Sequence, residues 1–68
     1  MIKVLDLHNT RHKEVDRLVE NFVLLEKPPL RIITGNSEKM IELVTKVLKR
    51  HNFKYESFIS GQLTILGE

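Results

Sequence analysis

A short apolar run containing an Asp and a His is followed by a turn in the stretch Val4-Leu5-Asp6-Leu7-His8-Asn9-Thr10. Residues 2–8 are mostly apolar and few in number, which is typical of a β-strand. Successive side chains of a strand point to opposite faces, so we expect Asp6 and His8 to project to the same side. Both stand at the carboxyl end of the strand, the edge where ligands bind in open α/β sheets. Asp6 and His8 are therefore the first candidates for a functional pair.

Two stretches with helical periodicity follow this strand. Apolar residues recur at helical spacing and predict helices over residues 11–25 and 38–51; these residues are Val15, Leu18, Val19, Phe22 and Val23 in the first helix and Met40, Ile41, Val44, Val47 and Leu48 in the second. We expect Asn9 or Thr10 to cap the first helix and Asn36 or Ser37 to cap the second. Pro28 and Pro29 end the first helix, because neither proline can continue it.

Three further strands complete the pattern. We expect them over residues 30–34, 53–58 and 63–66, with a turn at Ser60-Gly61. The order is then β-α-β-α-β-β. Strands joined through helices should be parallel, and strands joined by the tight turn antiparallel. The sequence therefore predicts one domain over residues 1–68, a two-layer α/β sandwich with a mixed four-stranded sheet and both helices on one face. Lys3, Arg31 and Lys54 would share the uncovered face.

The composition excludes several classes of protein. The 68 residues contain no Cys, so disulfides, thiolate zinc sites and a cysteine nucleophile are ruled out. No apolar run approaches the ~20 residues of a membrane span. The first residues enter the strand with no secretory signal, so a cytoplasmic location is the default expectation. The net charge of +2 decides nothing, because a nucleic-acid footprint depends on clustering.

Several of these residues resemble the signatures of a known family. Leu5-Asp6-Leu7-His8 is similar to the LDLHG signature of Smr (small MutS-related) domains, and Ile32-Ile33-Thr34-Gly35 resembles the family's second signature, a TGxG turn. Gly61 to Leu66 resembles the family's closing glycine and strand. The resemblance covers nearly the whole chain. It implies a fold similar to the C-terminal domain of translation initiation factor 3, and binding or endonucleolytic cleavage of RNA or DNA.

The chain departs from the family pattern at three positions. Asn9 stands where the first signature has Gly, and Ser37 where the second has its second Gly. Lys39 occupies a position at which the family often has His. Asn tolerates positive φ, so we expect Asn9 to keep a glycine-like backbone, and we expect Ser37 to serve as a cap. The departures leave open whether this chain is an endonuclease or a non-catalytic adaptor that binds nucleic acid or protein. A binder of small phosphates through the second helix is a third reading.

The candidate site follows from the resemblance and from local chemistry. Asp6 and His8 are the candidate catalytic pair, with His8 as general acid or base and Asp6 orienting it; a helix cap at Asp6 is the structural alternative. The candidate phosphate-binding residues are Asn9, Arg11, Thr34, Gly35, Asn36, Ser37 and Lys39. Lys13 and Arg17 add positive charge beside them, and Phe53, Tyr55 and Phe58 either stack on bases or belong to the core.

The remaining expectations concern metals and partners. His8 and His12 with Asp6 could hold a metal, although an exposed His12 is the simpler reading. Mg²⁺ is the candidate cofactor of a nuclease. His51 receives no functional role, since a basic residue suits a helix C-terminus. We expect RNA or DNA as the partner and no membrane, and the uncovered sheet face is a candidate surface for a protein or a second copy.

Overall fold

The computed structural model describes residues 2–57 and 61–67. Its elements follow the predicted order and are β1 (Lys3–Asp6), α1 (His12–Leu25), β2 (Leu30–Ile33), α2 (Glu38–Arg50), β3 (Lys54–Glu56) and β4 (Gln62–Gly67). The first strand is shorter than predicted, because the chain turns after Asp6. Phe58 and Ser60, which were predicted to end a strand and start a turn, lie outside the described residues.

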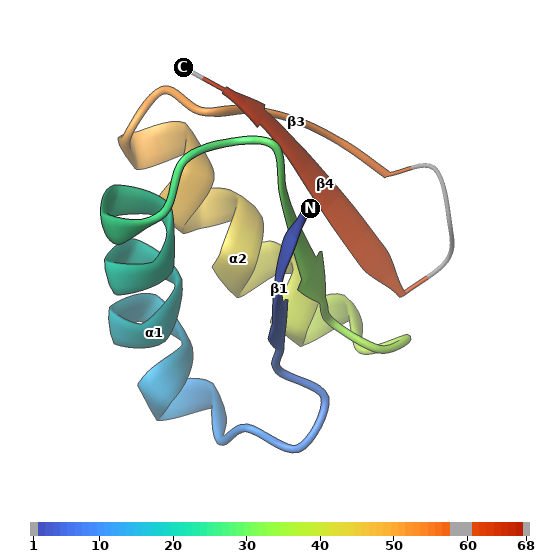
Figure 1. The fold of residues 1–68 in the computed structure, drawn as a ribbon. Helices are drawn as coiled ribbons and strands as arrows, with labels where there is room; N and C mark the ends of the chain where they lie inside the picture. Colours follow the sequence, from blue (N-terminus) through green and yellow to red (C-terminus); the bar gives the residue numbers. More distant parts are fainter. Residues whose placement is uncertain (1, 58–60, 68) are drawn as a thin grey trace.

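The sheet has the strand order β1-β2-β4-β3, with β1 parallel to β2 and β4 antiparallel to both of its neighbours. The predicted mixed four-stranded sheet of an α/β fold is thus confirmed. β2 and β3 are joined through α2 and run in the same direction, yet they are not neighbours, because β4 lies between them. Figure 1 shows the carboxyl ends of β1 and β2 at the same edge, where the chain turns toward α1 and α2.

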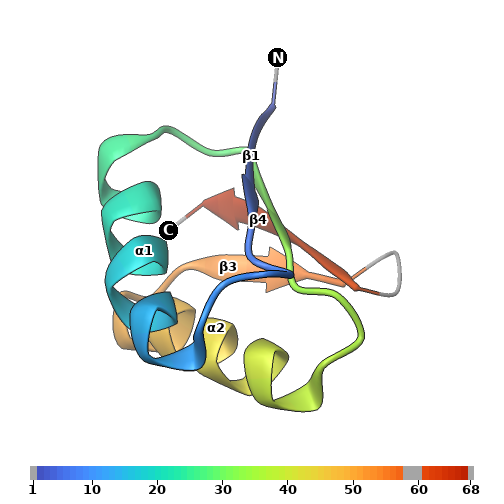
Figure 2. The ribbon, with the colours of Figure 1, turned by 90° about the horizontal axis from the view of Figure 1, so that it is seen from below.

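One set of alternating strand positions forms the core with the two helices. Leu30 and Ile32 of β2 pair with Ile65 and Leu63 of β4, and all four are buried. The buried residues of both helices join the same cluster; these are Val15, Val19, Val23, Met40, Val44, Val47 and Leu48. Figures 1 and 2 show α1 and α2 on the same side of the sheet. The apolar stripes of the sequence are therefore core residues.

The opposite face of the sheet carries the intervening residues. Arg31 pairs with Thr64, and both are only partly buried. Lys3 pairs with Leu30, so it belongs to the row of residues on the helix side. Lys54 lies at an irregularity in the pairing of β3 with β4. The prediction that Lys3, Arg31 and Lys54 share the uncovered face is therefore wrong for Lys3, because the register of β1 against β2 was not known.

The two helices begin differently. Ser37 caps α2, where its Oγ accepts a hydrogen bond from the Met40 N–H at 3.2 Å, as predicted. Arg11 is the N-cap of α1 and makes no side-chain capping bond. The expected cap from Asn9 or Thr10 is thus wrong: the helix starts later, after a turn in which the Thr10 N–H donates to the Leu7 carbonyl at 2.9 Å.

An ion network joins α1 to α2. The Arg50 guanidinium donates to both Asp16 carboxylate oxygens at 2.9 and 3.2 Å and to Glu20 at 3.0 Å. His51 Nε2 lies 3.0 Å from the same Glu20 carboxylate. Hydrogen bonds from Arg50 lower the pKa of Asp16, and a hydrogen bond from His51, followed by one from Arg50, lowers the pKa of Glu20. His51 thus has a structural partner.

No helix in the described residues, 2–57 and 61–67, has the length and apolar character needed to cross a membrane.

Candidate functional site

Asp6 and His8 are joined by two hydrogen bonds at the carboxyl end of β1. His8 Nδ1 lies 2.6 Å from Asp6 Oδ1, and the His8 backbone N–H donates to the same oxygen at 3.1 Å. About half of each side chain is exposed, 51% for Asp6 and 54% for His8. The two side chains therefore lie together, as the alternation of the strand predicted, on a surface that solvent can reach.

The residue between them holds the pair in place. Leu7 is fully buried, and its backbone N–H donates to the Ile33 carbonyl at 2.8 Å. This bond continues the contact between β1 and β2 beyond the strand itself. Because Leu7 is fixed toward the core, its neighbours Asp6 and His8 must face the other way.

The hydrogen bonds from His8 lower the pKa of the Asp6 carboxyl, the side-chain bond having the larger effect. Asp6 is then ionised at neutral pH and acts as an acceptor. A neutral His8 that donates its Nδ1 proton to Asp6 keeps an unprotonated Nε2, because the tautomer is set by the bond that the other nitrogen makes. An imidazole held by a carboxylate in this way can accept a proton at Nε2.

Two glycines bring a second and a third segment to the pair. Gly35 has φ +70°, and a Cβ there would lie 3.6 Å from the His8 Cβ. Gly61 has φ +83°, and a Cβ there would lie 3.4 to 3.5 Å from the Gly35 backbone. The Gly61 carbonyl accepts hydrogen bonds from the N–H groups of Thr34 at 2.8 Å and Gly35 at 3.1 Å. The end of β1, the end of β2 and the start of β4 therefore meet at this edge.

These bonds change the role expected for Thr34 and Gly35. Their N–H groups already donate to Gly61, so they are not free to bind a phosphate. Thr34 is 1% exposed, and its hydroxyl donates to the Gly35 carbonyl at 2.9 Å. Thr34 thus supports the turn from inside, and Gly35 alone of the two lies against His8. Gly61 was predicted as a turn glycine but missed as a part of the site, although its place in the closing signature was the available signal.

The remaining candidate residues surround the pair less closely. Asn36, Ser37 and Lys39 are exposed where the chain enters α2, and Asn9 and Arg11 are exposed between β1 and α1. Asn52 is the non-glycine residue with positive φ among those described, so the expected glycine-like backbone of Asn9 is wrong.

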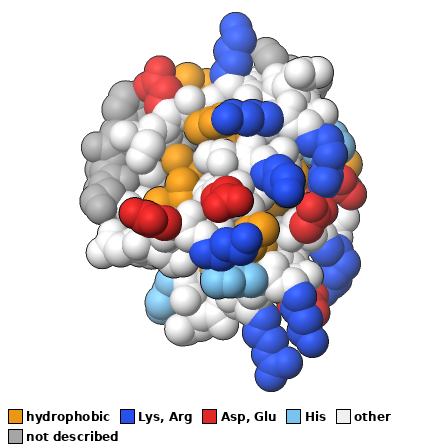
Figure 3. All heavy atoms as spheres, turned by 180° about the vertical axis from the view of Figure 1, so that it is seen from behind, with side chains coloured by type: hydrophobic (Ala, Val, Ile, Leu, Met, Phe, Trp, Pro, Cys, Tyr) orange, Lys and Arg blue, Asp and Glu red, His pale blue; other side chains and the backbone are white. Residues whose placement is uncertain are grey.

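Positive charge does not form a uniform patch on the side of the molecule seen from behind. Figure 3 shows the Lys and Arg side chains of this side interspersed with Asp and Glu. In α1, Arg17 is paired with Glu14, and Lys13 is exposed. Arg17 is therefore less available for a phosphate than its charge suggested.

No metal-ligand cluster forms in residues 2–57 and 61–67: no three His, Cys, Asp or Glu side chains are arranged to hold an ion. Asp6, His8 and His12 are thus not gathered around a common point in this structure. His12 is four residues after His8 in the sequence and is exposed at the start of α1.

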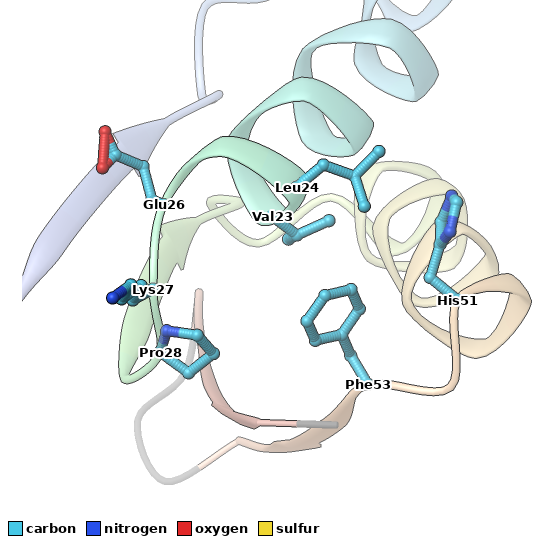
Figure 4. A pocket seen from close by; sticks show the side chains of 7 residues that line it. All are labelled: Val23, Leu24, Glu26, Lys27, Pro28, His51 and Phe53. Carbon is cyan, nitrogen blue, oxygen red and sulfur yellow. The ribbon is translucent and has the colours of Figure 1, made fainter.

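A pocket of about 290 Å³ lies at the far end of α1, lined by residues Val23, Leu24, Glu26, Lys27, Pro28, His51 and Phe53. Figure 4 shows Phe53 beneath Val23 and Leu24, whereas Glu26 and Lys27 point away. Phe53 is buried, so its reading as a core residue holds. The length of α1, roughly 20 Å, separates this pocket from His8. Its imidazole, His51, is already engaged by Glu20, so the pocket lacks the chemistry of the pair.

Comparisons with protein-family models, with curated proteins and with solved structures find no match for this chain. The resemblance to Smr domains accordingly rests on the residues of the sequence.

Proposed function

We propose that this domain binds RNA at the carboxyl edge of β1 and β2 and cleaves the phosphodiester backbone there, with His8 as the general base. The resemblance of the first strand and the second turn to Smr signatures supports nucleic acid as the partner. The observation that carries the catalytic part is the 2.6 Å contact between His8 Nδ1 and Asp6 Oδ1. Asp6 is the positioning residue, since it orients the imidazole and favours a free Nε2.

RNA is favoured over DNA because the site offers one general base, His8. A general base activates a nucleophile that the substrate brings, and the 2′-hydroxyl of RNA lies beside the phosphate that it attacks. His8 Nε2 takes the 2′-hydroxyl proton, the 2′-oxygen forms a bond to phosphorus, and the bond from phosphorus to the 5′-oxygen breaks. The departing 5′-oxygen takes a proton from solvent. DNA has no 2′-hydroxyl and offers no such nucleophile.

The phosphate contacts would come from the start of α2 and from nearby cations. The first N–H groups of a helix have no intrahelical acceptor, and the Met40 N–H is occupied by Ser37. The N–H groups of this first turn, with the Lys39 side chain beside them, are the expected phosphate donors. Arg11 provides a second cation on the neighbouring loop. Such contacts hold the backbone without reading its sequence.

A non-catalytic adaptor is the second candidate. The observation that favours it is the exposure of Asp6 and His8, because catalytic sites gain by excluding water and this pair stands on an open surface. In that case the same edge binds the nucleic acid, and no bond is broken. Binding through phosphates should still weaken steeply as salt is raised.

The test compares labelled RNA with DNA of the same sequence, each with EDTA and with Mg²⁺. The variants are His8→Ala, Asp6→Asn and His12→Ala, the last being a matched control because His12 is exposed nearby on the same segment. We expect wild type and His12→Ala to cleave RNA and spare DNA, and His8→Ala to lose about 100-fold or more in rate. Asp6→Asn should cleave more slowly than wild type.

Each other result has a defined meaning. Binding that survives in all four proteins without cleavage would favour the adaptor. If DNA were cleaved, and only with Mg²⁺ present, the mechanism would be metal-assisted and would not use a 2′-hydroxyl. Equal loss in His8→Ala and His12→Ala, or no binding at all, would refute the proposed site.

A further inference from the structure

The face of the sheet opposite the helices carries two opposite charges that form no ion pair with other residues of 2–57 and 61–67. Arg31 of β2 and Glu56 of β3 are both registered opposite Thr64 of β4, one on each side of it. Strands lie about 4.8 Å apart, so the two residues stand roughly 10 Å from each other across β4. Neither has an ion-pair partner within residues 2–57 and 61–67. A cation and an anion therefore flank the central strand in one row.

Apolar side chains accompany these charges. Leu66 of β4 is two residues beyond Thr64, so it projects to the same face, and it is 48% exposed. Val4 of β1 is registered opposite Arg31 and is 50% exposed. Figures 1 and 2 show no helix on this side of the sheet in the described part of the chain. The face thus combines exposed apolar groups with two charges that have no ion-pair partner among the described residues.

We propose that this face binds a second copy of the chain, forming a twofold dimer whose axis runs along β4. A twofold interface brings the same patch of both copies together. Each residue on one side of the axis therefore faces the partner residue that lies equally far from the axis on its other side. Arg31 of one copy then faces Glu56 of the other, and the same contact occurs twice. Leu66 meets its own counterpart on the axis. The two sheets pack face to face, as in aligned sandwiches.

The charge pattern is what selects this occupant. A polyanion would be repelled by Glu56, whereas an identical copy offers each charge its opposite. The proposal is independent of the proposed nuclease function. Asp6 lies on β1 and is separated from β4 by β2, so the catalytic pair stays at the margin of the dimer contact.

The dimer should be weak. With the axis on β4, the two copies overlap on β2, β4 and β3, about 14 Å across the strands and about 13 Å along them. This contact is small beside the roughly 800 Å² that each partner buries in a stable interface. Self-association should therefore depend on concentration. It is measured by sedimentation equilibrium up to about 1 mM, where even a millimolar Kd gives a detectable dimer fraction.

Charge reversal tests the contact itself. Arg31→Glu and Glu56→Arg should each raise the dimer Kd by about tenfold or more, because each variant places like charges opposite each other twice. A mixture of the two variants should dimerise again, since every facing pair is then opposite in charge. The double variant R31E/E56R should also recover. Lys27→Glu is the matched control, an exposed reversal on another surface, and should leave the Kd unchanged.

Three outcomes would overturn the proposal. The wild type could stay monomeric at every concentration. If Arg31→Glu then weakened RNA binding, the face would be assigned to nucleic acid instead. The dimer could be insensitive to both reversals, which would place the contact elsewhere. The reversals could also break a dimer that mixing does not restore, which would separate Arg31 from Glu56. Circular dichroism of each variant confirms that the surface changes leave the fold intact.

Discussion

Ser37 and Arg11 hold the same position at the starts of the two helices, and only Ser37 caps. Both have extended backbones, with ψ 116° at Ser37 and 140° at Arg11, the conformation that lets a side chain reach back to the first turn. Ser37→Ala removes the bond to the Met40 N–H and should lower the free energy of unfolding by about 1 kcal/mol. Arg11→Ala removes no capping bond, so it should leave that free energy nearly unchanged.

The same comparison can be run in the opposite direction. Arg11→Ser supplies a hydroxyl at a backbone already shaped for capping, and should stabilise α1 by up to about 1 kcal/mol. For a domain of this size, about 1 kcal/mol moves the Tm by roughly 4–8 °C. In urea, with a slope of about 1 kcal/mol/M, it moves the midpoint by about 1 M. Both shifts are measured by circular dichroism on the three variants and the wild type.

The results that would refute this reasoning are specific. Equal losses in Ser37→Ala and Arg11→Ala would mean that the Ser37 hydroxyl contributes nothing as a cap. An unchanged Tm in Arg11→Ser would mean that α1 does not begin where it is described. Arg11→Ser also separates stability from function, because the same variant should fold more stably and bind RNA less tightly once the cation is lost.

Three further predictions concern the core, a helix end and the candidate pair. Leu48→Ala should lower the free energy of unfolding in urea by about 2–5 kcal/mol, because the side chain is fully buried. Asn52 has φ +61°, so Asn52→Ala should cost about 1 kcal/mol in the same assay and Asn52→Gly should not. His8 lowers the pKa of Asp6 in the folded protein below its ordinary value of 3.8. The ionised Asp6 therefore stabilises the fold at any pH above 3.8, and this stabilisation is lost as the pH falls through the lower pKa of the folded protein. The difference in urea midpoint between wild type and Asp6→Asn should accordingly vanish in strong acid.

The helices were predictable because their signal is local. Val15, Val19 and Val23 repeat at the helical period, and every one of them is buried. The strand order was not predictable in the same way. The insertion of β4 between β2 and β3 depends on pairing between residues such as Arg31 and Thr64, which are far apart in the sequence. Lys3 was assigned to the wrong face for the same reason, since the face of an edge strand is fixed by its register.

In the candidate site, too, the local features could be predicted from the sequence and the long-range contacts could not. Strand alternation is local, and it placed Asp6 and His8 together correctly. The Gly61 carbonyl, in contrast, takes the N–H groups of Thr34 and Gly35 from a distant turn, and no pattern in the second signature indicates that those groups are already used. Sequence reasoning thus located the pair, while the surroundings of the pair required the tertiary structure.

The differences between this sequence and the Smr signatures that it resembles can be weighed by backbone geometry. Glycine adopts a positive φ at the lowest cost, and in the second turn the residue with positive φ is Gly35. Ser37, which stands in place of the second glycine, has φ −80° and caps α2. Asn9, which stands in place of the glycine in the first signature, has no positive φ either. Both substitutions therefore fall where this backbone places no demand for glycine, so neither one by itself argues that the edge beside Asp6 and His8 has lost its shape.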